Sequence, residues 1–362
     1  MKFAIAGVGN CASALLQGIA YYRSGGSQDT GGLMHPTIGG VNVADLSCVA
    51  AFDIDARKVG LPLSQAIHSP PNNAALLYSG DTLFPAIVQR GPTLDGFADH
   101  LHAYPPEKRI VISDREPVDI IENLRRAEAE VLVCYMPVGA EQAAKFYADA
   151  ALTAGVAFVN CVPVFIASDT IWANRFRAAG LPIVGDDIKS QVGATIVHRS
   201  LAQLFDDRGC VIDQTYQINV GGNLDFLNML SRERLASKKA SKTGAVQSVL
   251  REPLGSDEVH VGPSDYIPWL KDRKVAFIRL EGTGFAGAPL EVEVRLSVED
   301  SPNSAGVAVD AIRCAGIARR IGISGPLEAV CAYTMKRPPT HMPDYEAKIA
   351  LDQFIQHFGN CT

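Results

Sequence analysis

The chain has 362 residues, of which 47% are hydrophobic and 20% are charged, and its formal net charge is −6 at pH 7. This length and composition predict two globular domains and exclude a largely disordered chain. The acidic charge argues against nucleic-acid binding, which needs a basic face, and no run reaches the ~18 apolar residues of a membrane span. No signal-peptide pattern and no Cys-x-x-Cys pair occurs, so we expect a cytoplasmic protein with reduced thiols.

Apolar strands alternate with amphipathic helices in the first half of the chain. Helical patterns cover 116–130 and 140–154, and the segment 22–45 is polar and rich in glycine. The alternation predicts an α/β fold of the Rossmann type, a doubly wound parallel sheet with helices on both faces. We expect segment 22–45 to be a long surface insertion after the first helix. The predicted strands are 2–6, 46–53, 109–113, 131–136, 156–160 and 181–185.

The sequence changes character after about residue 200. A helix is expected at 193–207 and a strand at 210–220, followed by a polar stretch with several lysines. Apolar and charged residues then alternate at 274–280 and 290–296, which is typical of antiparallel strands with one solvated face. An apolar helix at 305–321 follows. We therefore predict a dinucleotide-binding domain at 1–200, an inserted α+β catalytic and oligomerisation domain at 201–309, and a C-terminal return to the first domain at 310–362.

The first predicted strand ends in a turn that fits the dinucleotide-binding fingerprint, Gly7-x-Gly9-x-x-Ala12. Gly7 permits the tight turn, Gly9 lets a pyrophosphate approach the backbone, and Ala12 allows close packing of helix on sheet. The helix that begins here offers unpaired N–H groups and the positive end of its dipole to a phosphate. Asn10 and Cys11 complete the predicted cofactor-binding turn. The alternative is a glycine turn that only reverses the chain.

Asp53 stands at the end of the second long predicted strand, where the fingerprint expects an acid that binds the ribose hydroxyls. It lies further along the chain than usual, which the insertion at 22–45 explains. An acid at this position repels a 2′-phosphate and so favours NAD over NADP. Arg57 and Lys58, which are close by in the sequence, weaken that preference.

A cluster of lysines lies in the second predicted domain. Lys238 and Lys242 are four residues apart in Ser-Lys-Lys-Ala-Ser-Lys, so a helix would place them on one face. Like charges at this spacing repel each other unless an anion bridges them. The cluster is therefore either a solvated basic face or part of a site for an anion.

Several longer motifs accompany this cluster, and together they resemble the myo-inositol-1-phosphate synthase family, particularly its shorter bacterial form. The similarity covers almost the whole chain. The motifs that carry it are GVGNCAS, QRGPTLDG, FVNCVPVFIAS, GDDIKSQVGAT, NVGGNLDFLNML, SKKASK, DRKVA and DSPNSAGV.

The resemblance implies an NAD-dependent isomerase that converts D-glucose 6-phosphate to 1D-myo-inositol 3-phosphate. The family oxidises C5 of the sugar, removes a C6 proton to form an enolate, closes the ring by an aldol step and reduces the ketone again. Inositol phosphate of this kind feeds phospholipid biosynthesis in some organisms. The resemblance also implies a homotetramer and admits an activating cation of unknown identity, although we predict no metal ligands.

Individual residues take roles from the same resemblance. It implies catalytic lysines that stabilise the phosphate and the developing oxyanions, and carboxylates that pair with these lysines. Further positions are implied on the cofactor side, among them Tyr147 on the helix after strand 131–136. The implied catalytic residues are Lys238, Lys242, Lys274, Lys336, Asp187 and Asp300, and the implied cofactor-side residues outside the turn are Asp53, Tyr147, Ser190 and Asp225.

Two other functions remain open from the residues. A net NAD-dependent dehydrogenase of a phosphorylated or amino-acid substrate would share the turn and Asp53, but it would not need four lysines in one site. A non-catalytic NAD-responsive binding protein would keep the turn and could lose the lysines.

Overall fold

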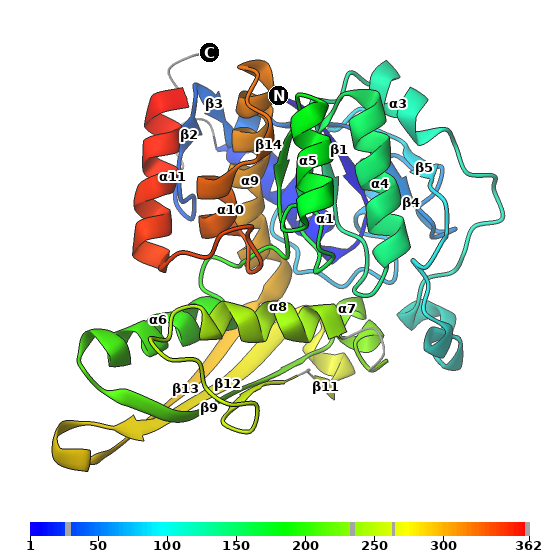
Figure 1. Ribbon diagram of the computed structural model, residues 1–362. Coiled ribbons are helices and arrows are strands. Elements are labelled where there is room, and N and C mark those ends of the chain that lie inside the picture. Colours follow the sequence, from blue (N-terminus) through cyan, green and yellow to red (C-terminus); the bar gives the residue numbers. More distant parts are fainter. Residues whose placement is uncertain (26–29, 232–235, 263–264, 359–362) are drawn as a thin grey trace.

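The computed structural model describes residues 1–25, 30–231, 236–262 and 265–358. A seven-stranded sheet forms the upper part of the molecule in Figure 1. All of its neighbouring strands pair in parallel, and strands are added on both sides of β1, as in a doubly wound fold. The predicted fold class is thereby confirmed. The spatial order is β14 (Gly325–Pro326), β8 (Pro182–Val184), β7 (Ala157–Asn160), β6 (Val131–Cys134), β1 (Lys2–Ala6), β4 (Ser47–Asp53) and β5 (Val88–Arg90).

Helices cover both faces of this sheet because successive side chains of each strand point to opposite faces. In β1, Phe3 and Ile5 pack with one group of helices, while Ala4 and Ala6 pack with the other. Both faces are therefore apolar, which explains the nearly continuous apolar runs of the sequence. On the first face lie α1 (Asn10–Ser24), α9 (Asp300–Arg320), α10 (Glu328–Thr334) and α11 (Asp344–Phe358); on the second lie α3 (Ile120–Arg126), α4 (Glu141–Ala154) and α5 (Thr170–Ala178).

A second sheet forms the lower part in Figure 1. Its main strands are long and antiparallel, and α6 and α8 cover the face turned toward the first sheet. The strands are β10 (Val259–Val261), β9 (Val211–Gly221), β12 (Arg273–Thr283) and β13 (Pro289–Glu299), with β11 (Asp265–Tyr266) paired to β9. The helices are α6 (Ala194–Asp207), α7 (Leu224–Asn228) and α8 (Ala236–Gln247), and the short α2 (Leu63–Ala66) belongs to the upper part.

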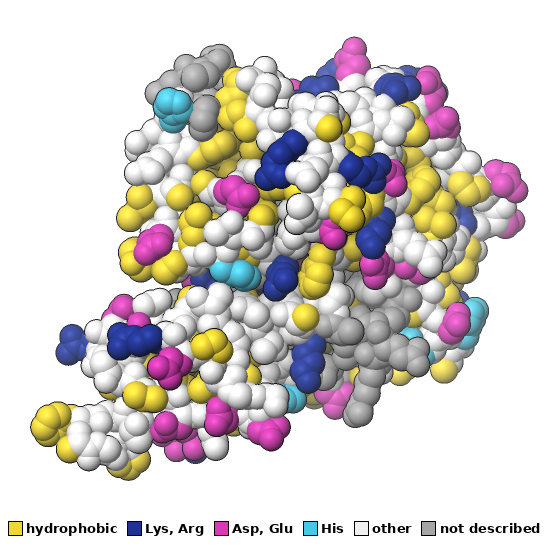
Figure 2. Space-filling view, in the orientation of Figure 1, with side chains coloured by type: hydrophobic (Ala, Val, Ile, Leu, Met, Phe, Trp, Pro, Cys, Tyr) yellow, Lys and Arg dark blue, Asp and Glu magenta, His cyan; other side chains and the backbone are white. Residues whose placement is uncertain are grey.

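The other face of the second sheet is open in this chain. Ile218 on β9 and Phe277 on β12 lie opposite each other and are both 43% exposed. Next to them Arg279 forms ion pairs with glutamates of β12 and β13. Figure 2 shows apolar side chains together with charged ones along this lower part of the molecule. The face thus joins an apolar patch to a charged one, in agreement with the predicted alternation.

The segment predicted as a surface insertion, 22–45, is mostly exposed or half-buried in its described residues, but part of it packs against the core. The segment contains the hairpin β2 (Thr37–Ile38) and β3 (Val41–Asn42), and Ile38, Val41 and Val43 are buried. The buried guanidinium of Arg313 on α9 donates hydrogen bonds to the carbonyl oxygens of His35, Pro36 and Val41. Because the segment contains few apolar residues, its composition does not predict burial. Those few apolar residues nevertheless face the core.

Other boundaries also differ from the prediction. Residues 109–113 form no strand but only an isolated bridge between Asp55 and Ile112, and β5 at the sheet edge comes from residues for which no strand was predicted. The helix predicted at 116–130 is confined to α3, which begins after the capping side chain of Asp119. The helix predicted at 305–321 begins at Asp300. In the described residues no helix has the length and apolar character that a bilayer span requires.

The structure suggests where the chain passes between its two parts. Residue 200 falls inside α6, which packs on the second sheet, and residue 309 falls inside α9, which packs on α1. We therefore propose that the second part runs from the start of α6 to the end of β13. This keeps each helix in one unit.

Arg313 provides a test of the buried segment. We expect Arg313→Met to lower the free energy of unfolding by about 3–5 kcal/mol, because it removes the buried guanidinium partner of Asp310, which then retains only its contact with His35 among these, and leaves three carbonyl oxygens without that donor. Chemical denaturation followed by circular dichroism measures this change. Arg320→Met, at a guanidinium more exposed and paired to Glu130, is the control and should change the value by less than about 1 kcal/mol. Equal effects of the two would contradict this role for Arg313.

Candidate active site

The candidate site is a cleft at the carboxyl ends of the parallel strands. Because parallel strands all end at one edge, the loops after β1, β4, β6, β7 and β8 meet there. The second sheet closes the cleft from the opposite side with residues before α7, on α8 and at the ends of β12 and β13. The cleft encloses about 1220 Å³ counted out to open solvent. Predicted residues that line it are Gly7, Gly9, Asn10, Cys11, Asp53, Asp187, Ser190, Asp225, Lys242, Lys274, Asp300 and Lys336.

The two glycines of the turn after β1 differ in the space around them: a side chain would clash at the first and would fit at the second. Gly7 has φ +95°, and a Cβ there would lie 2.5 Å from the carbonyl oxygen of Tyr135. At Gly9, φ is −90° and a Cβ would meet no protein atom within 4 Å. Gly9 also precedes α1 without any side chain that caps the helix, which leaves the first N–H groups to face the cleft. Ala12 is buried in the contact between α1 and the sheet.

Val8 lies between the two glycines, and side chains bind both its backbone N–H group and its carbonyl oxygen. Its N–H donates to Asp53 at 2.7 Å, and its carbonyl oxygen accepts from Lys58 at 2.7 Å and from Asn72 at 3.1 Å. Burial lowers the pKa of Lys58. Asp53 also accepts the N–H groups of the two residues after it, so it lies at the end of β4 with a fixed orientation.

Asp187 is the centre of the lysine side of the cleft. It has a left-handed backbone conformation, with φ +62°, which is strained for a residue with a side chain. Its carboxylate accepts from Lys336 at 2.8 Å and from the hydroxyl of Ser241 on α8 at 2.8 Å. Lys336 also donates to the carbonyl oxygen of Ile188 at 2.7 Å. Since α6 begins after Gly193, Asp187 does not cap that helix.

The neighbouring Asp186 has a different task. It is completely buried, and its carboxylate accepts hydrogen bonds from the side chains of Asn160 and Ser168 and from three backbone N–H groups. Burial raises its pKa to about 6. Asp186 fixes the loop after β7 and so supports the strained position of Asp187.

The other predicted catalytic residues lie on the second sheet and its helix. Lys274 donates to Asp300 at 3.1 Å, and both are partly buried. Lys242 is 5% exposed and lies next to Ser241 on α8. The backbone of Lys238 belongs to α8, as the spacing of the lysines predicts, but its side chain lies outside the described residues.

A buried ion cluster fixes the far end of α8. Arg199 on α6 donates to the carbonyl oxygen of Ala245, to Ser248 and to Asp344. Lys189, from the loop that carries Asp187, shares Asp344 at 2.9 Å, and burial lowers its pKa to about 8. The lysine helix and the Asp187 loop therefore have a common anchor at the start of α11.

Acidic groups surround the thiol of Cys11 at the start of α1. Burial and the carboxylates of Asp272, Asp300 and Asp225, in this order, raise its pKa to about 12. Asp272 is itself buried and accepts from Asn10, Asn223 and Ser301. Burial and Asp300 raise its pKa to about 6. Three carboxylates therefore lie around Cys11, one of them paired with Lys274, while Lys336 lies on the Asp187 side.

Two outcomes differ from the sequence analysis. Tyr147 does not line the cleft: it is 1% exposed and packs in the core against Phe52, with the ring centres 6.1 Å apart. Residues that the sequence did not assign also belong to the site. Asp272, Asn223 and Ser241 stand inside quoted motifs, whereas nothing in the pattern marks Lys58 or Asn72. Their positions depend on long-range contacts.

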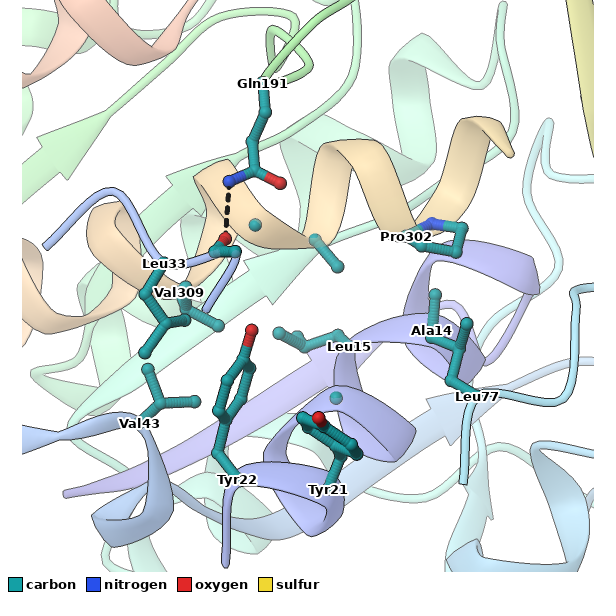
Figure 3. A pocket seen from close by; sticks show the side chains of 14 residues that line it. Ala14, Leu15, Tyr21, Tyr22, Leu33, Val43, Leu77, Gln191, Pro302 and Val309 are labelled. Carbon is teal, nitrogen blue, oxygen red and sulfur yellow. Dashed lines mark hydrogen bonds between the residues drawn. The ribbon is translucent and has the colours of Figure 1, made fainter. Parts of the chain in front are cut away.

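A second hollow of about 800 Å³ lies between α1 and α9 (Figure 3). Tyr21, Tyr22 and Leu15 point into it, and Gln191 closes one side by donating to the carbonyl oxygen of Gly32 at 2.7 Å. Among the described residues that line it there is no Asp, Glu, His, Lys or Arg side chain. The part of the chain that the structure describes shows no group of three or more His, Cys, Asp or Glu side chains suited to a metal ion.

The fold and the cleft define a Rossmann-type α/β protein in which lysine–carboxylate pairs and the glycine turn after β1 line one cleft. The family model described as myo-inositol-1-phosphate synthase matches residues 193–301. The inositol-3-phosphate synthase of Mycolicibacterium smegmatis is 55% identical over 98% of each chain, and that of Corynebacterium glutamicum is 53% identical over 98% of each. A crystal structure of a myo-inositol-1-phosphate synthase-related protein from Thermotoga maritima has a TM-score of 0.75 over 98% of each chain at 22% identity, which shows the shared fold.

The chain belongs to the inositol-3-phosphate synthase family. The resemblance found in the motifs is confirmed over the full length of the chain. The relatives are enzymes, so the reading as a non-catalytic binding protein is set aside.

The charge around Cys11 can be tested with a neutral alkylating agent. Because the thiolate is the reactive form, the raised pKa predicts that iodoacetamide at pH 8 modifies Cys11 much more slowly than the partly exposed Cys210. Peptide mass spectrometry over time measures the two rates. Asp300→Asn should accelerate alkylation of Cys11 and leave Cys210 unchanged. Fast modification of Cys11 in the unaltered protein would contradict the acidic environment.

Proposed function

We propose that this chain converts D-glucose 6-phosphate to 1D-myo-inositol 3-phosphate and that NAD is its cofactor. One observation carries the proposal: the dinucleotide turn and the lysine–carboxylate pairs line the same cleft. A net dehydrogenase would need the turn, but it would leave this set of lysines without a purpose. The full-length identity to curated synthases supports the isomerase.

The chain offers a suitable place for NAD. The open space at Gly9, the uncapped start of α1 and the carboxylate of Asp53 fit a pyrophosphate followed by a ribose. When bound, NAD supplies the redox chemistry, taking a hydride from C5 of the sugar and later returning it. Asn10, Cys11, Ser190 and Asp225 are the further residues that we assign to the cofactor side.

The lysines have tasks that follow from charge. The substrate brings a phosphate dianion, and loss of the C6 proton leaves an enolate whose oxygen is negative. An ammonium group already held in place stabilises such charge without reorganisation. We assign this role to Lys242 and Lys274 and assign Lys238 to the C5 oxygen. Lys274 is oriented by Asp300.

Lys336 and Asp187 form the pair that positions charge at the other end of the cleft. Their contact, with Ser241 on the second carboxylate oxygen, fixes the orientation of the carboxylate and of the ammonium. Such a pair can pass a proton to or from a sugar oxygen while its geometry is maintained. We assign both residues to catalysis.

Assembly and location complete the proposal. The open face of the second sheet, with Ile218 and Phe277, is suited to pack on another copy, and we propose a homotetramer formed through it. We propose a cytoplasmic location, and glucose 6-phosphate as the molecule that binds in the cleft. An activating cation is also compatible with the proposal, and we assign it no identity.

The activity has a direct test. Purified protein with NAD and glucose 6-phosphate should form inositol phosphate, detected by chromatography, without net accumulation of NADH. Lys274→Met should lower kcat/KM by roughly 100-fold or more, because an oxyanion contact contributes about 3 kcal/mol. Lys239→Met, on the exposed side of α8, should leave it nearly unchanged. Net NADH production without inositol phosphate would favour the dehydrogenase instead.

A substitution at Gly9 tests cofactor binding separately from folding. A side chain at this position meets no protein atom and has an allowed backbone conformation, so Gly9→Val should unfold at nearly the same denaturant concentration as the original protein. It would fill the space assigned to the pyrophosphate, so NAD binding by calorimetry should be lost. Gly18→Val, on a helix position that is also open, is the matched control. Retained NAD affinity in Gly9→Val would remove the turn from the binding site.

A further inference from the structure

Residues 72–77, here called the strap, run along α1 beside the cleft. The strap begins where Asn72 supports the carbonyl of Val8. It continues along the helix, where Gln17 donates to the carbonyl of Ala75 at 3.4 Å and accepts from the N–H of Leu77 at 2.8 Å. Gln17 is 1% exposed, so these contacts are protected from solvent. The strap is fixed to the helix that begins at the dinucleotide turn.

Asn73 connects this helix to the second sheet. It forms a reciprocal pair with Asn10: its N–H donates to Asn10 at 2.8 Å, and its side-chain oxygen accepts from Asn10 at 2.7 Å. Its amide nitrogen donates to the carbonyl oxygen of Gly222 at 3.1 Å, in the turn between β9 and α7. One asparagine thus joins the start of α1 to the opposite wall of the cleft.

The Gly222 end of this connection cannot move aside easily. A Cβ on Gly222 would lie 2.4 Å from the carbonyl oxygen of Ile267, so the backbone is tightly packed there. The N–H of Gly222 also donates to the carbonyl oxygen of Lys271. Asn223, the next residue, lines the cleft and binds Asp272. The contact from Asn73 therefore reaches a rigid part of the second sheet.

Asn10 reaches the same wall by a second route, through its hydrogen bond to Asp272 at 2.9 Å. Asn10 and Gly9 line the cleft where the pyrophosphate is expected. Separating the two walls at this point breaks the contacts of Asn10 and Asn73 together. Asn10 and Asn73 thus each supply a hydrogen bond between the walls beside the turn, and Asn228, which donates to the carbonyl oxygen of Val138, joins the walls further along the cleft.

We propose that Asn73 is a latch that keeps the two walls of the cleft together and retains the dinucleotide during turnover. The inference rests on the proposed function, in which one cofactor molecule must return the hydride that it took. If the walls separated between the two transfers, the reduced cofactor would leave and the keto sugar would remain unreduced. Asn73 is a positioning residue, because it acts through Asn10 and Gly222 and does not line the cleft.

Two substitutions test the latch. Asn73→Ala removes both side-chain bonds, and Asn73→Asp keeps the acceptor for Asn10 but replaces the donor to Gly222 by a carboxylate oxygen. Each lost bond contributes a modest amount, so we expect NADH to dissociate on the order of tenfold faster from both variants. Asn123→Ala, which truncates a half-buried asparagine on α3, away from the cleft lining, is the matched control and should match the original protein.

The main measurement is the dissociation of NADH, followed by its fluorescence after rapid mixing with excess NAD. A second measurement is free NADH and keto sugar in the medium during turnover of glucose 6-phosphate. Faster dissociation in both variants, with leakage of NADH, supports the latch. A lower kcat with unchanged dissociation would indicate a purely structural role and overturn it, as would unchanged values throughout.

The latch and the proposed function fail in different ways. If the original protein binds NADH but makes no inositol phosphate, the proposed function is wrong, and the dissociation rates alone still decide on the latch. Chemical denaturation of each variant reports whether it is folded. Asn73→Asp retains the contact with α1, so a folding defect confined to Asn73→Ala leaves the test intact.

Discussion

The parallel alignment of the seven strands is the constraint on which the site depends. It forces every strand to end at one edge, and the chain places a glycine directly after β1, β5 and β8. Gly7 and Asp187 follow β1 and β8, Asp53 ends β4, and all three line one cleft. Helices on both faces bury most residues of the strands, so their relative positions are rigid. The second sheet only needs to bring its lysines to this edge.

The charges of the cleft lie in two groups. Cys11 and buried Asp272 meet at the start of α1, and Lys242 lies with the Asp187–Lys336 pair near α8. Asp272 and Asp187 each bind side chains from distant segments, so their orientation is set before a substrate arrives. Preorganised charge of this kind is what stabilises an anionic intermediate, since nothing has to reorient as the charge develops.

The strand rhythm and the glycine turn could be predicted from the sequence because both are local. The fold class and β1, β4, β6, β7 and β8 follow from apolar runs, and the lysine helix follows from four-residue spacing. The prediction of a strand at 109–113 was wrong because an apolar run does not show whether a neighbouring strand is available to pair with it.

The site was predictable only where a motif marks its residues. Asn72 and Asn73 act through contacts to segments far away in the sequence, and neither residue type nor spacing reveals such contacts. Tyr147 shows the opposite case: a polar residue on a predicted helix near the turn can belong to the core. The roles assigned to individual residues therefore depend on geometry.

The sequence separation of the pairs in the cleft also matters during synthesis. Asn10 binds Asp272, 262 residues later, and Lys336 binds Asp187, 149 residues earlier. The last strand of the upper sheet, β14, pairs with β8 only once residue 326 has left the ribosome. A nascent chain thus has its dinucleotide turn from the beginning but no complete cleft until almost the whole polypeptide has emerged. Folding is therefore expected to finish after translation. Truncated chains that lack the last segments have no complete cleft in which to bind substrate.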